Sequence, residues 1–308
     1  MADCQLCGSH HDENQCPETR TGQLIDGYVV GTLLGVGGIA AVYNAKHLKL
    51  GRDIAIKVIH KRWADDAELS ARFVREARET AALGHPAFVT VFDAGKTADG
   101  CAYIEMDRLN GRDLYAVRTE EGPLDPDRVV QIAIAVLDAL SVLHARGTIH
   151  RDLKSSNIYL VNSEIGERVV LLDLGFAKAN DSLALTQKDQ MLGTPFYISP
   201  EQYLDPSEVD GRADLFSLGI VMWEILVGDF PYEYENKRDL LSKVMHGKLE
   251  RHPAVRRPEI PAWLDDIIAR SLAHKREERF ESALAMKTAL EAREQPDKPG
   301  LLKRMFGR

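Results

Sequence analysis

The sequence predicts an α+β chain with two lobes, in which a small antiparallel β-sheet with one helix precedes a larger, mainly α-helical part. Apolar and β-branched runs separated by glycine turns fill the first part of the chain, and long helical patterns follow Gly111. The chain has 308 residues, of which 44% are hydrophobic, so it can bury a sizeable core. This size allows two domains or one large two-lobed domain.

We expect the first lobe to span residues 28–108. Its first strand begins at Tyr28, where β-branched residues follow a polar, Cys- and His-rich arm over residues 1–27. The expected elements are a strand from Tyr28, strands over 41–48 and 53–60, a helix over about 65–83, and two further strands.

The second lobe should span residues 109–293 and consist mainly of helices. Asp125 and Pro126 supply an N-cap and a first-turn proline before apolar residues spaced three and four apart, which predicts a helix with one buried face. Residues 211–227 are apolar nearly all round, so this helix should run through the centre of the lobe. Further helical patterns cover residues 263–272 and 282–292.

Composition limits the possible functions. The formal net charge of −8 and the pI near 5.7 argue against nucleic-acid binding, because phosphate backbones require clustered Lys and Arg. Three of the four cysteines crowd the N-terminus, unlike the paired cysteines of a secreted disulfide scaffold. No signal peptide or membrane-spanning pattern is visible, so we expect a soluble, cytoplasmic protein.

Three short motifs indicate the chemistry. Residues 150–157 read HRDLKSSN, residues 173–175 read DLG and residues 199–201 read SPE. In this order they resemble the catalytic half of a protein kinase, and an unrelated polar loop would match by chance only rarely. Leu174 replaces the usual Phe of the second motif and keeps an apolar side chain there.

The resemblance implies a bilobal protein-kinase fold and a Hanks-type bacterial serine/threonine protein kinase. Lys154 and the Gly193-Thr194-Pro195 stretch are similar to the serine/threonine branch, in which the loop threonine, here Thr194, bonds Asp152 and Lys154. The expected substrates are therefore proteins with Ser or Thr acceptors.

A glycine-rich stretch, residues 35–42, lies between two predicted strands. A Walker loop or a dinucleotide fingerprint would instead open a helix, so the remaining alternatives are a kinase phosphate loop and a plain hairpin turn. Ala40 stands where the kinase family has its third glycine. By resemblance, ATP contacts Leu34, Gly35, Val36, Gly37, Gly38, Val42, Ala55, Lys57, the gatekeeper Met106, the backbones of Asp107 and Leu109, and Asp113 at the ribose.

Three of these assignments have simpler alternatives. Lys57 resembles the lysine that binds the nucleotide phosphates and pairs with a helix glutamate, here Glu76. An edge-strand solubilising lysine and a solvated helix charge would look the same in the sequence. Asp113 could equally be the start of a surface helix.

The catalytic motifs have the residue types that phosphoryl transfer needs. By resemblance, Asp152 accepts a hydrogen bond from the substrate hydroxyl and Lys154 stabilises charge on the γ-phosphate. Asn157 and Asp173 would supply oxygen ligands to Mg²⁺.

Two further assignments concern architecture. Glu201 should pair with Arg279, which would hold the activation segment to the large lobe. Asp214 lies within an apolar helix, and by resemblance it caps amides of the catalytic loop, since an unpaired buried carboxylate would be too costly.

Regulation by phosphorylation is expected from Arg151, which precedes Asp152. A phosphate on Thr186, or on Ser182 as second choice, would pair with Arg151 and Lys178 and order the activation segment. Autophosphorylation would involve self-association of the chain.

The N-terminal arm and the C-terminal tail leave alternatives open. Cys4, Cys7, His10 or His11, and Cys16 could bind one tetrahedral zinc ion, and His11 is our choice of imidazole. The alternative is an arm with free thiols. Residues 294–308 form a basic, flexible tail for which membrane contact is not expected.

The predicted function is therefore transfer of the γ-phosphoryl group of ATP to proteins. A pseudokinase scaffold that binds nucleotide without turnover is the alternative, although Lys57, Asp152, Asn157 and Asp173 are all present. A metabolite kinase of the same fold is disfavoured by the Gly-Thr and Ser-Pro-Glu activation segment.

Overall fold

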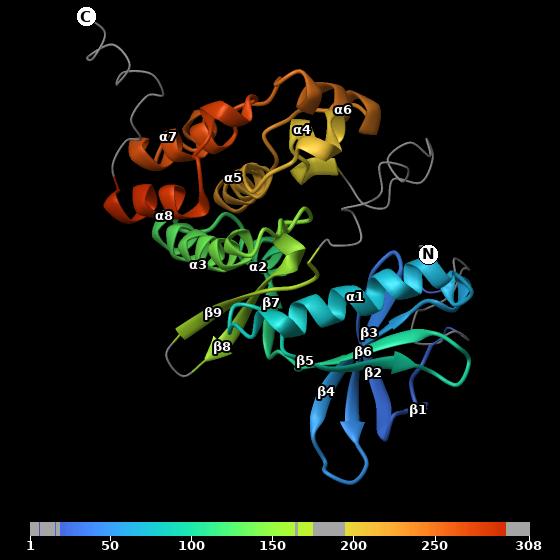
Figure 1. Ribbon diagram of the computed structural model, residues 1–308. Coiled ribbons are helices and arrows are strands. Elements are labelled where there is room, and N and C mark those ends of the chain that lie inside the picture. Colours follow the sequence, from blue (N-terminus) through green and yellow to red (C-terminus); the bar gives the residue numbers. More distant parts are fainter. Residues whose placement is uncertain (1–5, 7–15, 17–18, 164–165, 175–194, 294–308) are drawn as a thin grey trace, which may run out of the picture. The chain divides into compact units, whose positions relative to one another are not determined.

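The computed structural model describes residues 6, 16, 19–163, 166–174 and 195–293. The chain forms two compact units, Met1–Asn110 and Gly111–Arg308 (Figure 1). The first unit contains an antiparallel sheet with one long helix, and the second is mainly helical. This division agrees with the predicted β-rich and α-rich lobes.

In unit 1, six described strands form one sheet in the order β1-β2-β3-β4-β6-β5. The strands are β1 (Leu24–Ile25), β2 (Tyr28–Val36), β3 (Ala40–His47), β4 (Asp53–Ile59), β5 (Val91–Lys96) and β6 (Ala102–Met106).

Strand β1 was not predicted, because Asp26-Gly27 was interpreted as the end of a polar arm. Asp26 and Gly27 both have positive φ values, 44° and 81°, which is the conformation of a two-residue hairpin turn. This turn pairs β1 with β2, so the sheet begins before Tyr28. The sheet of unit 1 therefore includes two residues of the predicted arm, and the division into an arm and a kinase domain at residue 27 stays a prediction.

Both faces of the sheet are buried. On one face, Ile59 and Ile104 pack with Phe73 and Ala77 of helix α1 (Ala67–Leu83). The other face packs in a second core cluster that also contains Leu6 and Cys16 from the N-terminal segment. This arrangement explains why β4 is apolar at nearly every position.

Arg20 ties the N-terminal segment to the sheet. Its guanidinium donates to Asp99 at 2.8 Å and to the Cys101 sulfur at 2.9 Å. The hydrogen bonds from Arg20 lower the pKa of Asp99 to about 2. Of the described residues before Tyr28, Leu6, Cys16 and Arg20 are thus buried in unit 1.

Helix α1 begins and ends where its sequence predicts. The Asp66 side chain caps it by accepting a hydrogen bond from the Leu69 N–H, and Gly84 ends it with a left-handed φ of 56°. Phe73, Ala77 and Thr80 are buried at helical spacing, which places one face of α1 along the sheet (Figure 1).

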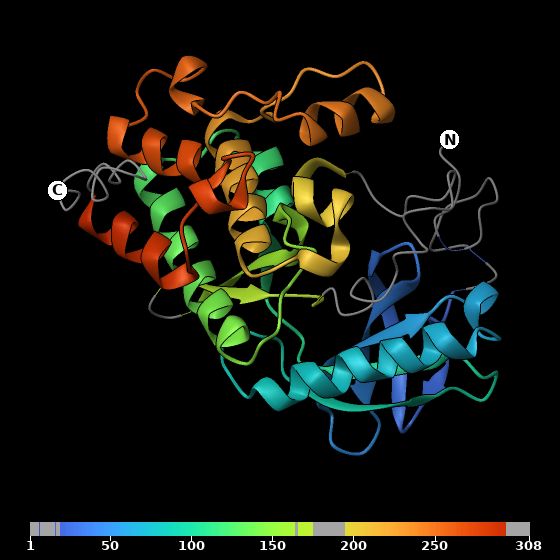
Figure 2. The same ribbon diagram turned by 45° about the horizontal axis from the view of Figure 1, so that its top comes forward.

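Unit 2 is built around one buried helix. Its elements are β7 (Gly111–Asp113), α2 (Leu114–Glu121), α3 (Pro126–Ala145), β8 (Ile158–Ser163), β9 (Gly166–Leu171), α4 (Pro200–Leu204), α5 (Arg212–Val227), α6 (Lys237–Met245), α7 (Ala262–Ser271) and α8 (Ala283–Ala292). All but the ends of α5 is buried, as predicted, and α8 lies alongside α3 in both ribbon views (Figures 1 and 2).

Helix α3 is the one helix of the described residues that is long and apolar enough to cross a membrane. Its buried residues, among them Val129, Val136, Leu140 and Leu143, pack within unit 2, where α3 contacts α5, α8 and β9. These contacts are those of a core helix.

The predicted pair of Glu201 and Arg279 is confirmed. The guanidinium of Arg279 is fully buried and donates to both carboxylate oxygens of Glu201, at 2.6 and 2.8 Å. Arg279 also donates to the backbone oxygens of Ala273, Arg212 and His274. The pair therefore joins α4 to the segment before α8.

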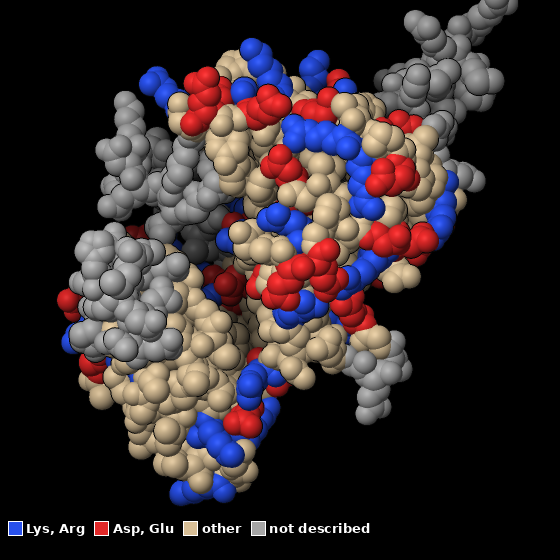
Figure 3. All heavy atoms as spheres, turned by 180° about the vertical axis from the view of Figure 1, so that it is seen from behind, with Lys and Arg blue, Asp and Glu red and all other residues tan. Residues whose placement is uncertain are grey.

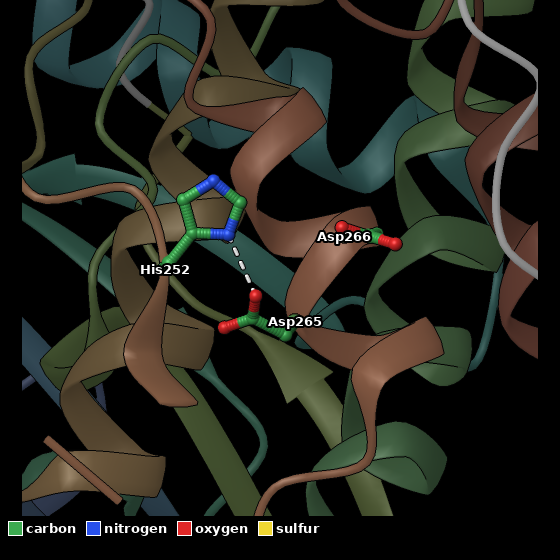
Figure 4. A group of neighbouring side chains, drawn as sticks. All are labelled: His252, Asp265 and Asp266. Carbon is green, nitrogen blue, oxygen red and sulfur yellow. Dashed lines mark hydrogen bonds and ion pairs between the residues drawn. The ribbon is translucent and has the colours of Figure 1, made fainter. Parts of the chain in front are cut away.

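A second polar contact joins the segment before α7 to that helix. His252 Nδ1 lies 2.6 Å from Asp265, whose other oxygen accepts the Ala254 N–H at 2.8 Å (Figure 4). Asp266 completes a group of possible metal ligands, but Figure 4 shows its carboxylate without a contact to the other two. Both Asp265 oxygens already have partners, so the group is explained as a structural contact.

Ion pairs also link the surface elements of unit 2. Arg112 pairs with Glu120 and Glu121, and Arg128 pairs with Glu121 and Glu167. Acidic and basic side chains are interspersed over this unit (Figure 3). Such exposed pairs contribute little to stability.

Glu105, on strand β6, has a buried carboxyl group. It is only 4% exposed, and its Oε1 has no hydrogen-bond partner within the described structure. Burial, together with the nearby charges of Asp26 and Asp93, raises the pKa of Glu105 to about 7. Glu105 therefore retains a proton in the folded protein at pH values where an unfolded chain has lost it.

Replacing Glu105 should flatten the dependence of stability on pH. The folded state binds the Glu105 proton more tightly than the unfolded state does. The stability that this proton contributes is therefore fully present below about pH 4.5 and is lost as the pH rises through 7. The slope has a limit of about 1.4 kcal/mol per pH unit. Urea unfolding at pH 5 and 7.5 should show a smaller change for Glu105→Gln than for the wild type or for Glu79→Gln on α1; equal changes would contradict the assignment.

Candidate active site

In unit 1, the sheet register gathers the predicted nucleotide-binding side chains. Val42 lies opposite Lys57, and Lys57 lies opposite Ile104 on the neighbouring strand. Ala55 lies opposite Met106 in the same way. Side chains directly opposite one another share a face of the sheet, and Ile104 belongs to the face that α1 covers.

Lys57 extends toward helix α1. Its Nζ lies 5.8 Å from the ring centroid of Phe73, which is on α1. Glu76 follows Phe73 by one helical turn, so both side chains lie on the same side of the helix, and Glu76 is half-buried. The ammonium of Lys57 is thus beside the part of α1 that carries Glu76.

The glycine-rich turn joins β2 to β3, as predicted. Gly35 lies opposite Val42, and a Cβ added at Gly35 would meet no atom within 4 Å. Packing inside the protein therefore does not require glycine there, which favours close approach of a ligand as the reason. The neighbouring Leu34 is 49% exposed, Val36 ends β2, and Gly37 and Gly38 lie in the turn itself.

Asp107 and Leu109 are the residues predicted to bind adenine through their backbone groups. The N–H of Asp107 donates to the Thr90 carbonyl at 2.8 Å, which leaves the Asp107 carbonyl as the group that could face adenine. Leu109 is half-buried. Asp113 caps helix α2 by accepting the Ala116 N–H at 2.9 Å, so the helix-start interpretation is confirmed while ribose contact stays a prediction.

In unit 2, the predicted catalytic residues lie together in one loop. Lys154 Nζ is 3.2 Å from Asp152 Oδ2, and Asn157 Nδ2 is 3.3 Å from the same oxygen. Asn157 Nδ2 also donates to the Asp152 backbone carbonyl at 2.9 Å. The carboxylate of Asp152 is therefore held by two neighbours and is half-buried.

Asp214 binds backbone N–H groups of the catalytic loop, as predicted. Its carboxylate accepts the backbone N–H groups of His150 and Arg151, each at 2.9 Å, and lies 2.8 Å from His144 Nε2. Asp214 is only 1% exposed, so these donors replace the water that it has lost.

His150 serves the loop as a neutral side chain. Its Nδ1 accepts the Asp152 N–H at 3.3 Å, and burial lowers the pKa of the imidazole. Leu174 is buried as expected from its apolar character.

The two predicted Mg²⁺ ligands lie at the same end of the β8–β9 hairpin, Asn157 just before β8 and Asp173 just after β9. The Leu172 N–H donates to the Asn157 carbonyl at 2.9 Å, which places Asn157 beside the segment that carries Asp173. Because the Asn157 amide nitrogen donates into the loop, its Oδ1 is left as an acceptor. With the exposed carboxylate of Asp173, this all-oxygen donor set fits Mg²⁺.

Two residues of these motifs have a strained backbone. Arg151 has φ of 62° and Asp173 has φ of 47°, both in the left-handed region that non-glycine residues avoid. Such strain costs on the order of 1–3 kcal/mol each and is found mainly at functional sites. The Arg151 carbonyl is held by Gln202 Nε2 at 3.0 Å.

One buried network was missed in the sequence. Glu224 accepts hydrogen bonds from Ser155, at 3.1 Å, and from Tyr197, at 2.7 Å, while Arg118 Nε lies 3.6 Å away. Burial raises the pKa of Glu224 and that of Tyr197. The network joins the catalytic loop to α5, and its signal was the same as that of Asp214, a carboxylate inside an apolar helix.

Several predicted residues lie outside the described part of the chain. They are Cys4, Cys7, His10, His11, Lys178, Ser182, Thr186, Thr194 and the tail 294–308. Of the proposed zinc ligands, Cys16 is described, and its thiol is buried in the core of unit 1.

Comparison with known proteins agrees with this geometry. Residues 28–291 match the protein kinase domain family. Serine/threonine-protein kinase pkn3 of Myxococcus xanthus is 37% identical over 273 residues, which is 86% of this chain and 49% of that protein. PknB of Mycobacterium leprae is 36% identical over 272 residues, 87% of this chain and 43% of that protein. The chain thus spans less than half the length of these curated relatives.

Solved structures show the same fold. The PknI kinase domain of Mycobacterium tuberculosis superposes with a TM-score of 0.68 at 27% identity, over 90% of this chain and 100% of that one. Rad53 in complex with AMP-PNP has a TM-score of 0.70 at 23% identity, over 85% of this chain and 64% of that one. The predicted kinase fold is confirmed, and the chain belongs to the protein kinase family, among the Hanks-type serine/threonine kinases of bacteria.

Proposed function

We propose that the chain is a serine/threonine protein kinase that transfers the γ-phosphoryl group of ATP to protein hydroxyls. The observation that supports this most directly is the catalytic loop of unit 2. Its carboxylate, Asp152, is held by Lys154 and Asn157, and its backbone is capped by buried Asp214. The curated relatives named above are serine/threonine-protein kinases, which supports the same reaction class.

The loop residues have complementary tasks in this reaction. Asp152 would accept the hydrogen bond of the substrate hydroxyl, align it with the γ-phosphorus and take its proton late in the transfer. Lys154 would donate to the transferring phosphoryl group as charge develops. Asn157 and Asp173 would hold Mg²⁺, which when bound would supply positive charge against the negative charge of the phosphates.

Unit 1 would hold the nucleotide. Lys57, positioned beside α1 and Glu76, supplies the cation that the α- and β-phosphates need. The amides of the glycine-rich turn would cover the phosphates, while Val42, Ala55 and Met106 form the apolar surface for adenine.

A pseudokinase scaffold is the second candidate function. It would bind nucleotide with the same residues but fail to transfer phosphate. Ala40 and Leu174 are departures from the family pattern, and neither removes a charge or a metal ligand. The complete set of polar residues therefore favours the enzyme.

Control by phosphorylation forms part of this proposal. Thr186, or Ser182, would be the acceptor on the activation segment, modified by a second copy of the chain in the cytoplasm. Arg151 and Lys178 would then bind the phosphate.

Phosphate transfer from radiolabelled ATP with Mg²⁺ tests the proposed function. Wild-type protein should label itself and a generic basic protein on Ser or Thr, and mass spectrometry should place the self-label at Thr186 or Ser182. Asp152→Asn should lose about a thousandfold or more of this activity, because positioning and proton acceptance fail together. Asp266→Asn on α7 is the matched control and should retain activity. Nucleotide binding without transfer by the wild type would establish the pseudokinase instead.

The N-terminal segment is proposed to hold one structural zinc ion. Cys4, Cys7 and His11 would complete a tetrahedral site with Cys16, whose burial in the core of unit 1 suits a structural ligand. Metal analysis should find about one zinc per wild-type chain and none in a Cys4→Ser, Cys7→Ser double variant. If purified wild-type protein contains no bound zinc, the proposal is wrong and the arm has free thiols.

A further inference from the structure

The turn between β2 and β3 is held from one side by the residues that follow β4. His60 Nε2 lies 2.8 Å from the Gly37 carbonyl oxygen, and Arg62 Nη2 lies 3.0 Å from that of Gly38. The backbone N–H of His60 donates to the Ile39 carbonyl at 2.9 Å. Three consecutive carbonyl groups of the glycine-rich turn therefore point toward the segment from His60 to Arg62.

The chemistry of the two side chains fits this task. A carbonyl oxygen only accepts hydrogen bonds, so His60 must carry a proton on Nε2. His60 is 5% exposed, which shields its bond from water, while Arg62 is exposed but charged. The two bonds thus combine a buried contact with a charge-assisted one.

Peptide geometry fixes where the amide groups of the turn point. All described peptide bonds are trans, so the carbonyl and the N–H of each peptide unit point in opposite directions. The carbonyls of Gly37 and Gly38 share peptide units with the N–H groups of Gly38 and Ile39. These N–H groups therefore point away from His60 and Arg62. Successive N–H groups on one side form the kind of concavity that binds anions.

We infer that His60 and Arg62 are positioning residues for the phosphate-binding turn, orienting its amide groups toward the triphosphate of ATP and restricting its motion. This inference rests on the proposed kinase function. His60 follows Lys57 closely along the chain, with Ile59 paired to Ala40. One stretch of backbone therefore positions both the lysine and the turn that contact the same phosphates.

Steady-state kinetics of four substitutions test this role. His60→Leu and Arg62→Ala should each lower kcat/KM for ATP by about five- to tenfold, the effect of losing one hydrogen bond at a binding site. The KM for the protein substrate should not change. His60→Gln and Arg62→Lys keep a donor and should stay within about twofold of the wild type. Lys61→Ala, at an exposed residue between His60 and Arg62, is the control and should match the wild type.

The results separate this inference from the proposed function. If the wild type transfers phosphate and His60→Leu and Arg62→Ala keep its kcat/KM for ATP, the positioning role is wrong and the kinase stands. An equal rise in the KM for protein substrate, with no rescue by Gln or Lys, would show a merely structural role and also overturn it. If the wild type neither binds nor uses ATP, the proposed function fails. Hydrogen exchange tests directly whether His60 and Arg62 restrict the motion of the turn. The amides of residues 37–40 should exchange faster in His60→Leu and Arg62→Ala than in the wild type, and unchanged exchange would overturn the inference.

Discussion

The carboxylate of Asp214 is the interaction on which the catalytic loop depends. It lies inside an apolar, buried helix, where an unpaired charge would be strongly destabilising. The N–H groups of His150 and Arg151 remove that cost, but they can do so only if the chain passes over α5 in one conformation. That conformation includes the left-handed backbone of Arg151, and it presents Asp152 next to Lys154 and Asn157. A requirement of burial thus determines the geometry of a polar site.

The same relation between burial and polar geometry recurs elsewhere in the molecule. Glu224, on the same helix as Asp214, holds Ser155 and Tyr197, and Arg279 holds Glu201. In unit 1, burial of both sheet faces leaves few polar positions on β4, and Lys57 occupies one of them beside α1. Polar groups are buried where they fix the position of a functional segment, and the apolar core around them makes the fixation rigid.

Much of this arrangement could be predicted because its signals are local. The HRDLKSSN motif, the apolar helix with Asp214 and the proline-capped helix from Pro126 each occupy one continuous stretch. The role of Asp214 was implied by the family resemblance and is consistent with the cost of an unpaired buried carboxylate, and the structure confirms it.

The features that were missed depend on contacts between distant residues. Asp26-Gly27 has the sequence of a hairpin turn, but it was interpreted as a boundary because the arm before it is polar. Nothing local shows that Leu6 and Cys16 pack under the sheet, since their neighbours in the sequence are polar. His60 and Arg62 bind backbone carbonyls, which every residue possesses, so no residue type in the turn identifies them as partners.

The most direct test of the central claim is the turnover number of Asp214→Asn, measured with saturating ATP and protein substrate on folded, soluble protein. In either orientation, the NH₂ group of the asparagine would face the N–H of His150 or of Arg151, which is also a donor, so one hydrogen bond is lost and the loop should lose its defined conformation. We expect kcat to fall by about a hundredfold, the effect of about two charge-assisted hydrogen bonds, with the affinity for ATP in unit 1 little changed. A folded Asp214→Asn protein with the kcat of the wild type would contradict the claim that this carboxylate sets the catalytic geometry.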